Sequence, residues 1–506
     1  MRVLFVNHVN YLQSPLPEGI ALLSSLLKQQ GHKVELFDTA FLKPPSYDDP
    51  SVSKKGSAGI SFYRSTPYSL GDLVKDDPVV DIGQRFIEVV DRFKPTLIAV
   101  SAMTTNYEQS LDIIKQAKVQ AKHSFEVIFG GVHPTLMPEE VMKEHATDYV
   151  CIGEGEEPLL ELCSSLEKGE DVSGILNLYI KKGNGKRGEI IRNGLRPFVD
   201  LDSLPTPDFS IFDPRYFFKP FQGDIYRGVF MSTSRGCPRG CAYCVNNKLN
   251  KLFKDCGRKQ IRFQSPKIVA KHIEFIQKNH GVNWIRFSDD TFLMRTLKDL
   301  KELASLLKPL GIMFGCAIDP VTVTEEKVKA VKEMGCVSMS IGIETGNETM
   351  RRKVLGRNIS NEQIRRAIKI IRDHDIKISA FNMIGLPDET SENVYETIRF
   401  NKELGVPDAN LYILYPFPET KIYHDCHVAA RFKNRIPPMD EAHTFNLSKM
   451  TQEELLFFFK TFNLYLVLPE TYWDRIEAAR KNLKAYDDLV KIAQEIVERT
   501  NADSAV

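Results

Sequence analysis

Three cysteines near the middle of the chain stand close enough together to bind iron. Cys237, Cys241 and Cys244 are spaced C-x3-C-x2-C and follow an apolar run that is typical of a strand. Thiolates are the usual ligands of iron–sulfur clusters, and a cubane needs four ligands. Three cysteines would leave one iron open to bind a substrate or cofactor. Three structural cysteines or a zinc site are the alternatives, but zinc usually takes a second cysteine pair or histidines at a matching distance, and none follows.

The residues around these cysteines suit a cluster that the backbone wraps closely. Gly236 and Gly240 permit that close approach, and Tyr243 is expected to lie over a neighbouring ligand. Further along, Glu344 lies between two glycines, where a carboxylate can accept hydrogen bonds from hydroxyl or ammonium groups. Asp289 has a similar position after an apolar run, although it serves equally well as an ordinary turn or helix cap.

A block of alternating strands and helices would position these residues. The block contains six apolar runs that predict strands: Val229–Ser232, Trp284–Phe287, Met313–Ala317, Ser338–Ile343, Ile378–Met383 and Leu411–Tyr415. Helix starts are readable between them, with Ser265 before Pro266 and a capping box of Ser360 with Gln363. Six such units predict a partial parallel barrel, whose chemistry would lie at the C-terminal ends of its strands.

The cysteine motif and this barrel resemble the radical S-adenosylmethionine (radical SAM) superfamily over about residues 225–430. The other matching segments are the strand ends Phe287–Phe292, Gly342–Gly346 and Phe381–Pro387. The resemblance implies a 4Fe-4S cluster on the three cysteines, with an open iron that chelates S-adenosylmethionine and electron transfer that yields a 5′-deoxyadenosyl radical. The residues that it implies for cofactor binding are Tyr243, Ser288, Asp289, Glu344 and Asn382. The exit from the last strand, 412–420, departs from the family pattern, because Glu419 stands where relatives often carry glycine.

The first 165 or so residues alternate in the same way and predict a doubly wound parallel sheet. The predicted strands are Val3–Val6, Val34–Phe37, Leu97–Val100, Val127–Phe129 and Tyr149–Ile152. Small and polar residues follow three of them, where an open sheet binds ligands. These residues are Thr104, Thr105, Asn106, Gly130, Gly131, His133, Pro134, Gly153, Glu154, Gly155 and Glu156. No G-x-G-x-x-G fingerprint follows the first strand, which counts against a dinucleotide site.

The same segments resemble the cobalamin-binding domain that precedes many radical SAM barrels. The signatures are Gly-Gly-x-His-Pro at 130–134 and Gly-Glu-Gly-Glu at 153–156. The resemblance implies that this edge of the sheet binds cobalamin. The chain lacks the Asp-x-His-x-x-Gly loop by which other cobalamin proteins supply a histidine to cobalt. His133 is therefore not assigned as that ligand, and a turn histidine held by Pro134 is its simplest alternative role.

Composition gives no indication of a nucleic-acid partner, a membrane segment or secretion. The 67 Lys and Arg residues balance 66 Asp and Glu residues, and no basic-aromatic stripe indicates a nucleic-acid partner. The longest apolar stretch, Leu455–Leu468, spans 14 residues and is interrupted by Lys460 and Asn463. A membrane span needs about 20 apolar residues, so we expect no integral membrane segment. The start of the chain does not resemble a secretory signal, and we expect a cytoplasmic protein.

The predicted fold is α/β with four regions. A Rossmann-like cobalamin-binding sheet covers 1–174, a linker covers 175–225, a partial (β/α)6 radical SAM barrel covers 226–430, and a helical domain covers 431–506. A long loop or lid is expected at 39–78, where Ser, Gly and Pro are frequent.

The resemblance implies a cobalamin-dependent radical SAM methyltransferase. Its acceptor would be an unactivated carbon of a natural product, lipid, tetrapyrrole or protein side chain such as glutamine, and its reductant a ferredoxin or flavodoxin. The alternatives are a cobalamin-dependent radical SAM cyclase or oxidoreductase without methyl transfer, and a non-enzymatic sensor. A methylthiotransferase would need three cysteines before the barrel, where only Cys151 and Cys163 occur.

Overall fold

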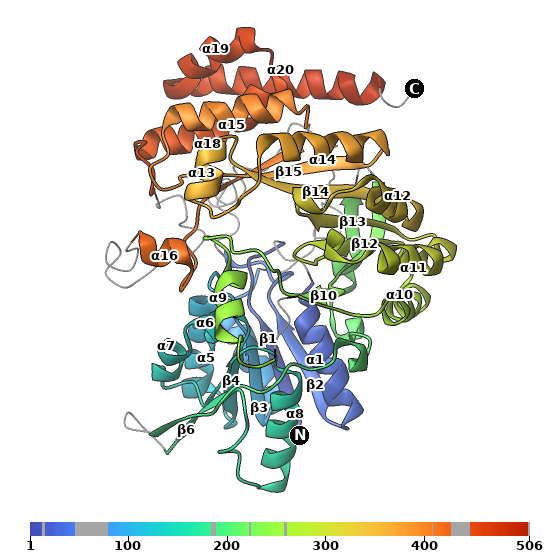
Figure 1. The fold of residues 1–506 in the computed structure, drawn as a ribbon. Coiled ribbons are helices and arrows are strands. Elements are labelled where there is room, and N and C mark those ends of the chain that lie inside the picture. The colour runs from blue at the N-terminus through green and yellow to red at the C-terminus, as the bar shows by residue number, and fades with distance from the viewer. Residues whose placement is uncertain are drawn as a thin grey trace.

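The computed structural model describes residues 1–12, 16–45, 79–183, 189–221, 224–257, 261–406, 408–426 and 446–503. These residues form two seven-stranded sheets, a small two-stranded sheet and a helical C-terminal segment. In Figure 1 the N-terminal sheet and the C-terminal helices lie at opposite ends of the molecule, with the second large sheet between them. Most of the loop predicted at 39–78 lies outside the described residues.

The N-terminal sheet has the strand order β2-β1-β3-β4-β5-β6-β7. Its first five strands are parallel, as predicted, and are β1 (Arg2–Asn7), β2 (Lys33–Asp38), β3 (Leu97–Ser101), β4 (Glu126–Gly130) and β5 (Tyr149–Cys151). Alternate residues of β1 enter different cores, because successive side chains of a strand point to opposite faces.

Helices cover both faces of this sheet. Val3 and Phe5 pack with α1 (Glu18–Gln29) and α8 (Glu156–Lys168) on one side. Leu4 and Val6 pack with α4 (Ile82–Phe93) and α5 (Tyr107–Gln120) on the other. The short helices α6 (Val132–Leu136) and α7 (Pro138–Lys143) follow β4. The doubly wound architecture is therefore confirmed.

The segment 175–225 is more structured than the predicted linker. Strands β6 (Leu178–Lys182) and β7 (Glu189–Arg192) extend the N-terminal sheet in antiparallel fashion. Strand β8 (Phe218–Phe221) already belongs to the barrel. These strands are short, and β7 has no fully buried position, so they lack the continuous apolar run by which the central strands are predicted.

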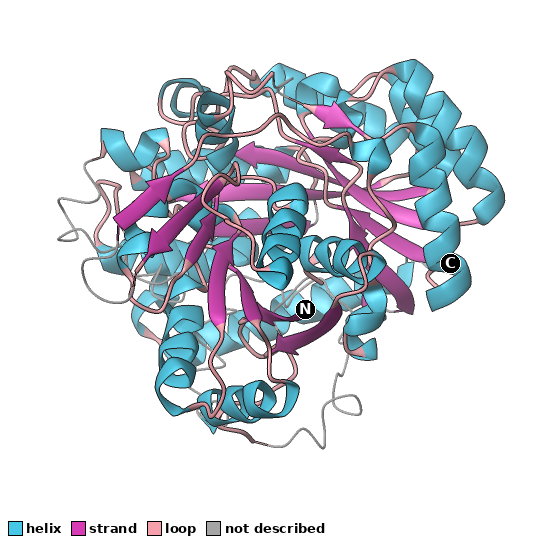
Figure 2. Cartoon of the chain, turned by 90° about the horizontal axis from the view of Figure 1, so that it is seen from below, coloured by secondary structure: helices cyan, strands magenta, loops and turns pink. Residues whose placement is uncertain are grey.

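The barrel sheet has the order β16-β15-β14-β13-β12-β9-β8. Its six parallel strands match the six predicted runs: β9 (Asp224–Met231), β12 (Trp284–Phe287), β13 (Met313–Ile318), β14 (Cys336–Glu344), β15 (Lys377–Ile384) and β16 (Asp408–Ile413). The main outer helices are α10 (Pro266–His280), α11 (Leu297–Leu307), α12 (Glu325–Met334), α14 (Asn361–Asp373) and α15 (Ser391–Glu403). Figure 2 shows helices around the strands of both sheets. The partial barrel is confirmed.

Helix starts agree in part with the capping signals. Ser360 and Gln363 form the predicted capping box of α14. Ser265 is the N-cap of α10, but its side chain makes no cap hydrogen bond. Thr451 and Glu454 form a capping box at the start of α18.

The C-terminal helices pack against one flank of the barrel. They are α18 (Gln452–Val467), α19 (Trp473–Ala478) and α20 (Leu483–Asp503). Leu455, Phe458 and Phe462 of α18 share a core with Val394 of α15 and Leu411 of β16. Within the described ranges, no helix is long and apolar enough to cross a membrane.

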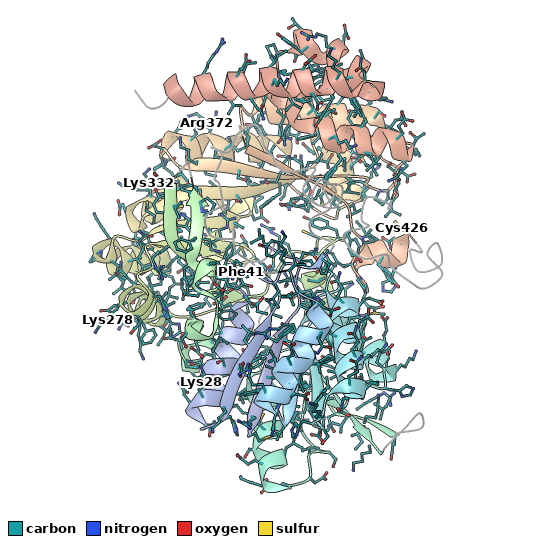
Figure 3. The ribbon with its side chains drawn as sticks, turned by 180° about the vertical axis from the view of Figure 1, so that it is seen from behind. Lys28, Phe41, Lys278, Lys332, Arg372 and Cys426 are labelled. Atoms are coloured by element: carbon teal, nitrogen blue, oxygen red, sulfur yellow. The ribbon has the colours of Figure 1, made fainter. Side chains whose placement is uncertain are left out.

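The two sheets are joined through the segment before β8. Asp208 accepts hydrogen bonds from Ser24 and from Lys28 at 2.7 and 2.6 Å, which ties this segment to α1. The ring of Phe41 lies edge-on to Tyr216, with ring centres 5.0 Å apart. Lys28 and Phe41 are labelled in Figure 3, where Phe41 lies between the two sheet regions. These contacts hold the N-terminal sheet against the barrel sheet.

Candidate functional site

The three cysteines lie in one loop at the C-terminal end of the first parallel barrel strand. The loop runs from β9 through β10 (Ser234–Arg235) to α9 (Val245–Leu252). All three thiols are free and half-buried. Burial raises the pKa of the Cys237 thiol to about 12, and the nearby thiols of Cys241 and Cys244 add to that shift. The loop therefore gathers three mutually interacting thiols in one place.

Neighbouring segments hold this loop by hydrogen bonds. The buried carboxylate of Asp289 accepts from Thr233 N at 3.2 Å, from Thr233 Oγ1 at 2.9 Å and from Ser234 Oγ. The amide of Asn250 on α9 donates to the Cys237 carbonyl at 2.8 Å. Ala242 N donates to the Leu355 carbonyl at 2.8 Å. The cysteines are therefore positioned from the barrel, from α9 and from the segment after β14.

A second group of side chains lies at the end of β14, beside the cysteine loop. Tyr243 donates to Glu344 Oε1 at 2.9 Å, and Arg357 donates to the same oxygen at 2.6 Å. The hydrogen bonds that Glu344 accepts from side chains of the described residues both go to Oε1, and none goes to Oε2. Glu344 has φ 67°, in the left-handed region that costs a non-glycine residue about 1–3 kcal/mol. The strand register shifts between Gly342 and Glu344, which turns this carboxylate toward the cysteine loop.

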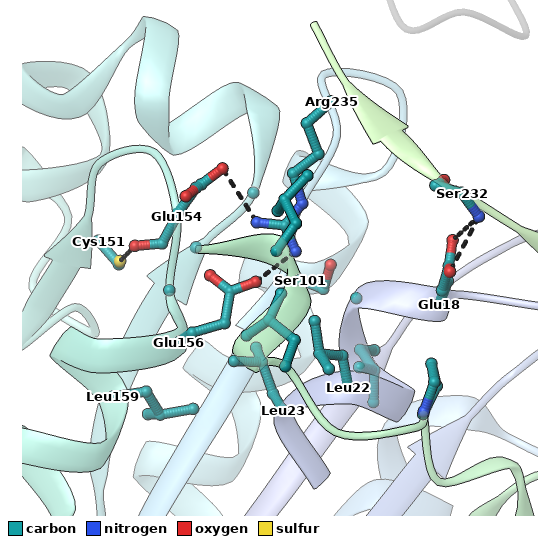
Figure 4. Close-up of a pocket in the computed structure, with 18 of the residues that line it drawn as sticks. Glu18, Leu22, Leu23, Ser101, Cys151, Glu154, Glu156, Leu159, Ser232 and Arg235 are labelled. Atoms are coloured by element: carbon teal, nitrogen blue, oxygen red, sulfur yellow. Dashed lines mark hydrogen bonds and ion pairs between the residues drawn. The ribbon is translucent and has the colours of Figure 1, made fainter. Parts of the chain in front are cut away.

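A cavity of about 370 Å³ lies between the C-terminal edge of the N-terminal sheet and the strands β9 and β10. Figure 4 shows its polar and apolar sides. Arg235 spans it, with Nη1 at 3.0 Å from Glu154 and Nη2 at 2.5 Å from Glu156. Leu22, Leu23 and Leu159 form part of the apolar wall. Arg235 lies two residues before Cys237, so the cysteine loop is tied directly to the N-terminal sheet.

A buried carboxylate completes the contact between the two sheets. Both oxygens of Glu18, at the start of α1, accept from Ser232 N at 2.9 and 2.8 Å (Figure 4). Burial raises the pKa of Glu18 to about 7, and these hydrogen bonds only partly offset the shift. Glu18 therefore titrates near neutral pH inside the cavity.

Comparison with known proteins finds a family match in the N-terminal sheet region and another in the barrel. The Radical SAM superfamily pattern matches residues 231–400, and the B12 binding domain pattern matches residues 70–163. An uncharacterized methyltransferase of Pyrococcus horikoshii is 32% identical over 343 residues, which cover 66% of this chain and 70% of that protein. The chain belongs to the radical SAM superfamily and carries a B12-binding domain.

Other relatives of this radical SAM protein are more distant. An anaerobic magnesium-protoporphyrin IX monomethyl ester cyclase of Rubrivivax gelatinosus is 25% identical, and the match covers 67% of this chain but only 60% of the cyclase. A bacteriochlorophyllide d C-12(1)-methyltransferase of Chlorobaculum tepidum is 24% identical, with 65% of each protein covered. Relatives thus include enzymes named as methyltransferases and as cyclases.

Solved structures share the fold. The radical SAM methyltransferase TsrM of Kitasatospora setae superposes with a TM-score of 0.60, at 17% identity, over 84% of this chain and 76% of that one. The cobalamin-dependent radical SAM enzyme OxsB with aqua-cobalamin bound gives 0.64 at 15% identity, over 98% and 72%. The arrangement of a B12-binding sheet before a radical SAM barrel is therefore a known architecture.

The radical SAM domain implies a 4Fe-4S cluster and S-adenosylmethionine, and the cysteine loop fits the cluster. Within the described ranges, no three His, Cys, Asp or Glu side chains converge on a point, as a single metal ion would require. A cubane has an iron at each of four corners, so its three thiolates bind separate irons and need not converge. Burial also raises the pKa of Cys244 to about 11, so the thiols are protonated until iron binds and displaces the protons.

The B12-binding domain implies cobalamin, and the predicted residues fall into two groups around the cavity. Six of them line it: Gly130, Gly131, Gly153, Glu154, Gly155 and Glu156. The other five do not line it: Thr104, Thr105, Asn106, His133 and Pro134. That each of the eleven contacts cobalamin stays a prediction. Glu154 and Glu156 are engaged with Arg235, which sequence reasoning did not foresee.

His133 is buried and neutral. Its ring stacks on Tyr107, with centres 4.2 Å apart, and Nδ1 lies 3.3 Å from Thr104 Oγ1. Burial lowers the pKa of His133 to about 4. Asn106 Oδ1 accepts from Met103 N at 2.8 Å and so shapes the same turn. These contacts favour the structural role for His133 that we set beside ligand binding.

Two cavity glycines are required by the backbone itself. Gly131 has φ 104°, and a Cβ there would lie 2.7 Å from the Ala102 carbonyl. Gly153 has φ 83°, and a Cβ would lie 2.5 Å from the Phe253 ring of α9's C-terminal cap. Both glycines thus serve chain conformation in addition to any approach of a ligand.

The remaining predicted cofactor residues lie in different surroundings. Ser288 is exposed at the end of β12. Asp289 is buried and bonded to the cysteine loop, so it positions the loop, and a direct cofactor contact stays a prediction. Asn382 points to the outer side of β15, where its amide exchanges hydrogen bonds of 3.1 and 2.9 Å with Asn401 of α15. The structure does not bring Asn382 to the cluster side, which does not support its predicted role.

Glu419, where relatives often carry glycine, occupies a glycine-like conformation with φ 63°. Its carboxylate lies 2.7 Å from Lys248 Nζ on α9. The ion pair ties the exit of β16 to the helix that follows the cysteine loop. The departure from the family pattern thus adds a charged contact over the opening of the barrel.

Sequence reasoning missed Glu18, Arg235 and Arg357. Each acts through a partner distant in the sequence: Ser232, the Glu154–Glu156 pair, and Glu344. The sequence shows Arg235 as a cation beside the cysteine motif, but it does not show which acidic residues pair with it. Arg357 and Glu18 carry no local signal, because an isolated charge usually lies on a solvated face.

Proposed function

We propose that the protein is a cobalamin-dependent radical SAM methyltransferase that acts on an unactivated carbon of a natural product, lipid, tetrapyrrole or protein side chain such as glutamine. The observation that carries this proposal is the direct contact of Arg235, in the cysteine loop, with Glu154 and Glu156 in the cavity at the edge of the B12-binding domain. When bound, the two cofactors would supply a radical that removes a substrate hydrogen atom and a methyl group that replaces it. A reductant such as ferredoxin or flavodoxin belongs to the proposal.

The chain's own residues would bind and orient these groups. Cys237, Cys241 and Cys244 would hold the cluster, and the free Oε2 of Glu344 would accept a hydrogen bond from S-adenosylmethionine. Met103 and Val132 are 50% and 37% exposed at the edge of the B12-binding sheet, where apolar surface suits a macrocycle. The ion pairs of Arg235 would keep the proposed cluster site and the proposed cobalamin site next to each other.

A cyclase or oxidoreductase without methyl transfer is the alternative. The 25% identity to the Rubrivivax gelatinosus cyclase favours it, since that relative is similar over 67% of this chain. Both functions would need the cluster and the cavity, so the geometry supports each of them. They differ in whether the methyl group of S-adenosylmethionine reaches a product.

Methyl-labelled S-adenosylmethionine separates the two functions. The anaerobically reconstituted, cobalamin-loaded protein would be reduced and given the label, with and without a small-molecule extract as the source of acceptor. We expect label on the protein-bound cobalamin, and 5′-deoxyadenosine that is absent in Cys237→Ala. Formation of 5′-deoxyadenosine with no label on cobalamin or any product would favour the cyclase. Absence of both products would contradict the methyltransferase and the cyclase alike.

A further inference from the structure

The inner face of the barrel sheet carries a cation that the known cofactors do not explain. Arg286 stands on β12, in register with Phe230 of β9 and Gly315 of β13. Its neighbours Ile285 and Phe287 are buried in the core shared with the outer helices. Because side chains alternate between the two faces of a strand, Arg286 lies on the inner face of the barrel.

Arg286 has a hydroxyl partner but no carboxylate partner. Its Nη2 donates to Ser340 Oγ at 2.8 Å. Among the side chains that the structure describes, it forms no ion pair. Burial lowers the pKa of Arg286, and only the thiols of Cys316 and Cys336 oppose the shift. The guanidinium of Arg286 is partly buried and has no negative partner among the described residues, so it can bind an anion from outside the chain.

The inner face near Arg286 keeps partial exposure, although its partner Ser340 is itself buried. Inward-facing positions on neighbouring strands keep partial exposure, among them Phe230, Ala317, Ser338, Gly342, Ser379 and Asn410. Outward-facing Met339 and Ile341, which alternate with them on β14, are fully buried. Most of these inward side chains are small, so they leave the guanidinium of Arg286 less covered than a packed core would.

Gly315 makes room for the guanidinium. A Cβ at this position would lie 3.0 Å from Arg286 Nη1 and 2.5 Å from Ser338 Oγ. Any larger residue would displace Arg286 or Ser338. The local sequence thus preserves space beside the charge.

A second cation lies on the same face. Lys219 of β8 places Nζ 5.0 Å from the centre of the Phe230 ring. Burial lowers the pKa of Lys219 to about 8, and no charged group opposes the shift. The described residues give it no ion pair either. Two partly buried cations, Arg286 and Lys219, therefore lie on one face beside Phe230, and the described residues give neither of them an ion pair.

We propose that the inner face of the barrel binds an anionic group, a carboxylate, phosphate or phosphonate, at Arg286 and that the acceptor substrate carries this group. This proposal rests on the proposed function, because it names a substrate class for the same barrel. S-adenosylmethionine also carries a carboxylate. Ser340, the partner of Arg286, precedes Glu344 by four residues, or about 13 Å along the strand. Arg286 therefore lies deeper in the barrel than Glu344, toward the N-terminal ends of the strands and away from the cysteine loop. This position favours the substrate as the source of the anion.

Calorimetry on the reconstituted holoprotein with S-adenosylmethionine bound tests the proposal. The probes are phenylphosphonate and benzoate as anions and benzyl alcohol as a neutral analogue. We expect the wild type to bind the anions and not the alcohol. Arg286→Gln should weaken anion binding about tenfold or more, the loss of a charged hydrogen bond, whereas Arg286→Lys should retain part of it. Arg399→Gln, which removes an exposed arginine paired with Glu392 on the outer helix α15, is the matched control and should bind normally.

Iron content, the thermal unfolding midpoint and affinity for S-adenosylmethionine would be measured for every variant. Absence of anion binding by the wild type, or equal binding by a folded Arg286→Gln variant, would overturn the site. Loss of S-adenosylmethionine affinity in Arg286→Gln would overturn the assignment to substrate, since the anion would then be the methionyl carboxylate. Failure of the proposed function is a separate result, because it would leave anion binding intact while no label is transferred.

Discussion

The side chain of Glu344 is held in one direction by its neighbours. Tyr243 and Arg357 occupy one of its oxygens and leave the other free, while the backbone at Glu344 stays in the left-handed region. Such strain persists only where the surroundings enforce it, and it is common at functional sites. The carboxylate is therefore fixed in direction, so little conformational entropy is lost when it accepts a hydrogen bond.

Glu344→Gln should weaken S-adenosylmethionine binding. Loss of a charge-assisted hydrogen bond costs about 1.5–3 kcal/mol, or roughly 10–100-fold in affinity. Calorimetry on the reconstituted protein measures this change. Glu348→Gln, on the following helix α13 (Glu348–Lys353), is a nearby control and should have little effect. Unchanged affinity in Glu344→Gln would remove this residue from the site.

Glu18 should make the stability of the cofactor-free protein depend on pH. Its pKa is raised to about 7 in the folded protein, so between about pH 4.5 and 7 the folded state holds a proton that the unfolded chain has lost. Stability that depends on this proton is full below that window and is lost as the pH rises through it, by up to about 3 kcal/mol.

In the Glu18→Gln variant the side chain at this position no longer titrates. Its unfolding midpoint in urea should therefore fall less than that of the wild type between pH 5 and pH 8. Glu88→Gln, which removes an exposed carboxylate paired with Arg85, should follow the wild type. Equal pH dependence in Glu18→Gln and the wild type would show that Ser232 and Arg235 keep this carboxylate ionised.

At the level of elements, the loops that leave the parallel strands decide what the cavity can hold. Gly131 and Gly153 are fixed by backbone conformation, so their substitution would disturb the fold as well as the ligand. Gly155 differs, because a Cβ there would meet only Cys151 Sγ at 3.8 Å and Leu23 at 3.9 Å. It also lines the cavity and precedes α8, which makes it the better position for a test.

Gly155→Val should fill part of the cavity and lower cobalamin uptake at least tenfold, while the iron content stays unchanged. The absorbance of bound cobalamin after gel filtration measures the uptake. Gly174→Val in the same region has open space around its Cβ and is the matched control. Normal uptake by Gly155→Val would place the corrin and its nucleotide outside this cavity.

The sequence predicts elements well where burial alone determines their pattern. Trp284–Phe287 and the other central strands are apolar because helices cover them, and their predicted positions agree with the structure within a few residues. Strands β6 and β7 are half-polar and lack that pattern. Side-chain direction also escaped prediction, since Asn382 turns to α15 only because its register on β15 places it outward. The pairing of Arg235 with Glu154 joins positions far apart in the chain and has no local signature.

At the scale of the whole molecule, ion pairs hold the B12-binding sheet against the radical SAM barrel. Arg235 is 28% exposed, whereas its partner Glu156 is only 8% exposed. Removal of one member of a buried pair leaves the other charge without compensation, which is strongly destabilising. The relative position of the two halves therefore depends on a residue that also begins the cysteine loop.

Arg235→Gln should loosen this contact. Amide hydrogen exchange should become faster at 153–156 and at 232–235, and cobalamin affinity should decrease although no predicted cobalamin residue is changed. Arg196→Gln is the matched control, because Arg196 pairs with Glu157 and Glu161 of the same helix α8 but within the N-terminal half. Exchange rates that match the wild type in Arg235→Gln would mean that the apolar contacts alone fix the two halves.

Helix α18 covers part of the barrel only late in synthesis of the chain. Strand β16 is the last in its sheet, and its Leu411 is buried by Phe458 and Phe462, which are translated later. While a ribosome is still adding the residues after 413, the finished part of the barrel exposes this apolar flank and an unpaired strand edge, both of which favour aggregation. Helix α18 then covers the apolar flank. Nascent chains that stall between 413 and 452 should therefore bind chaperones or aggregate, although every segment predicted to bind a cofactor has already been made.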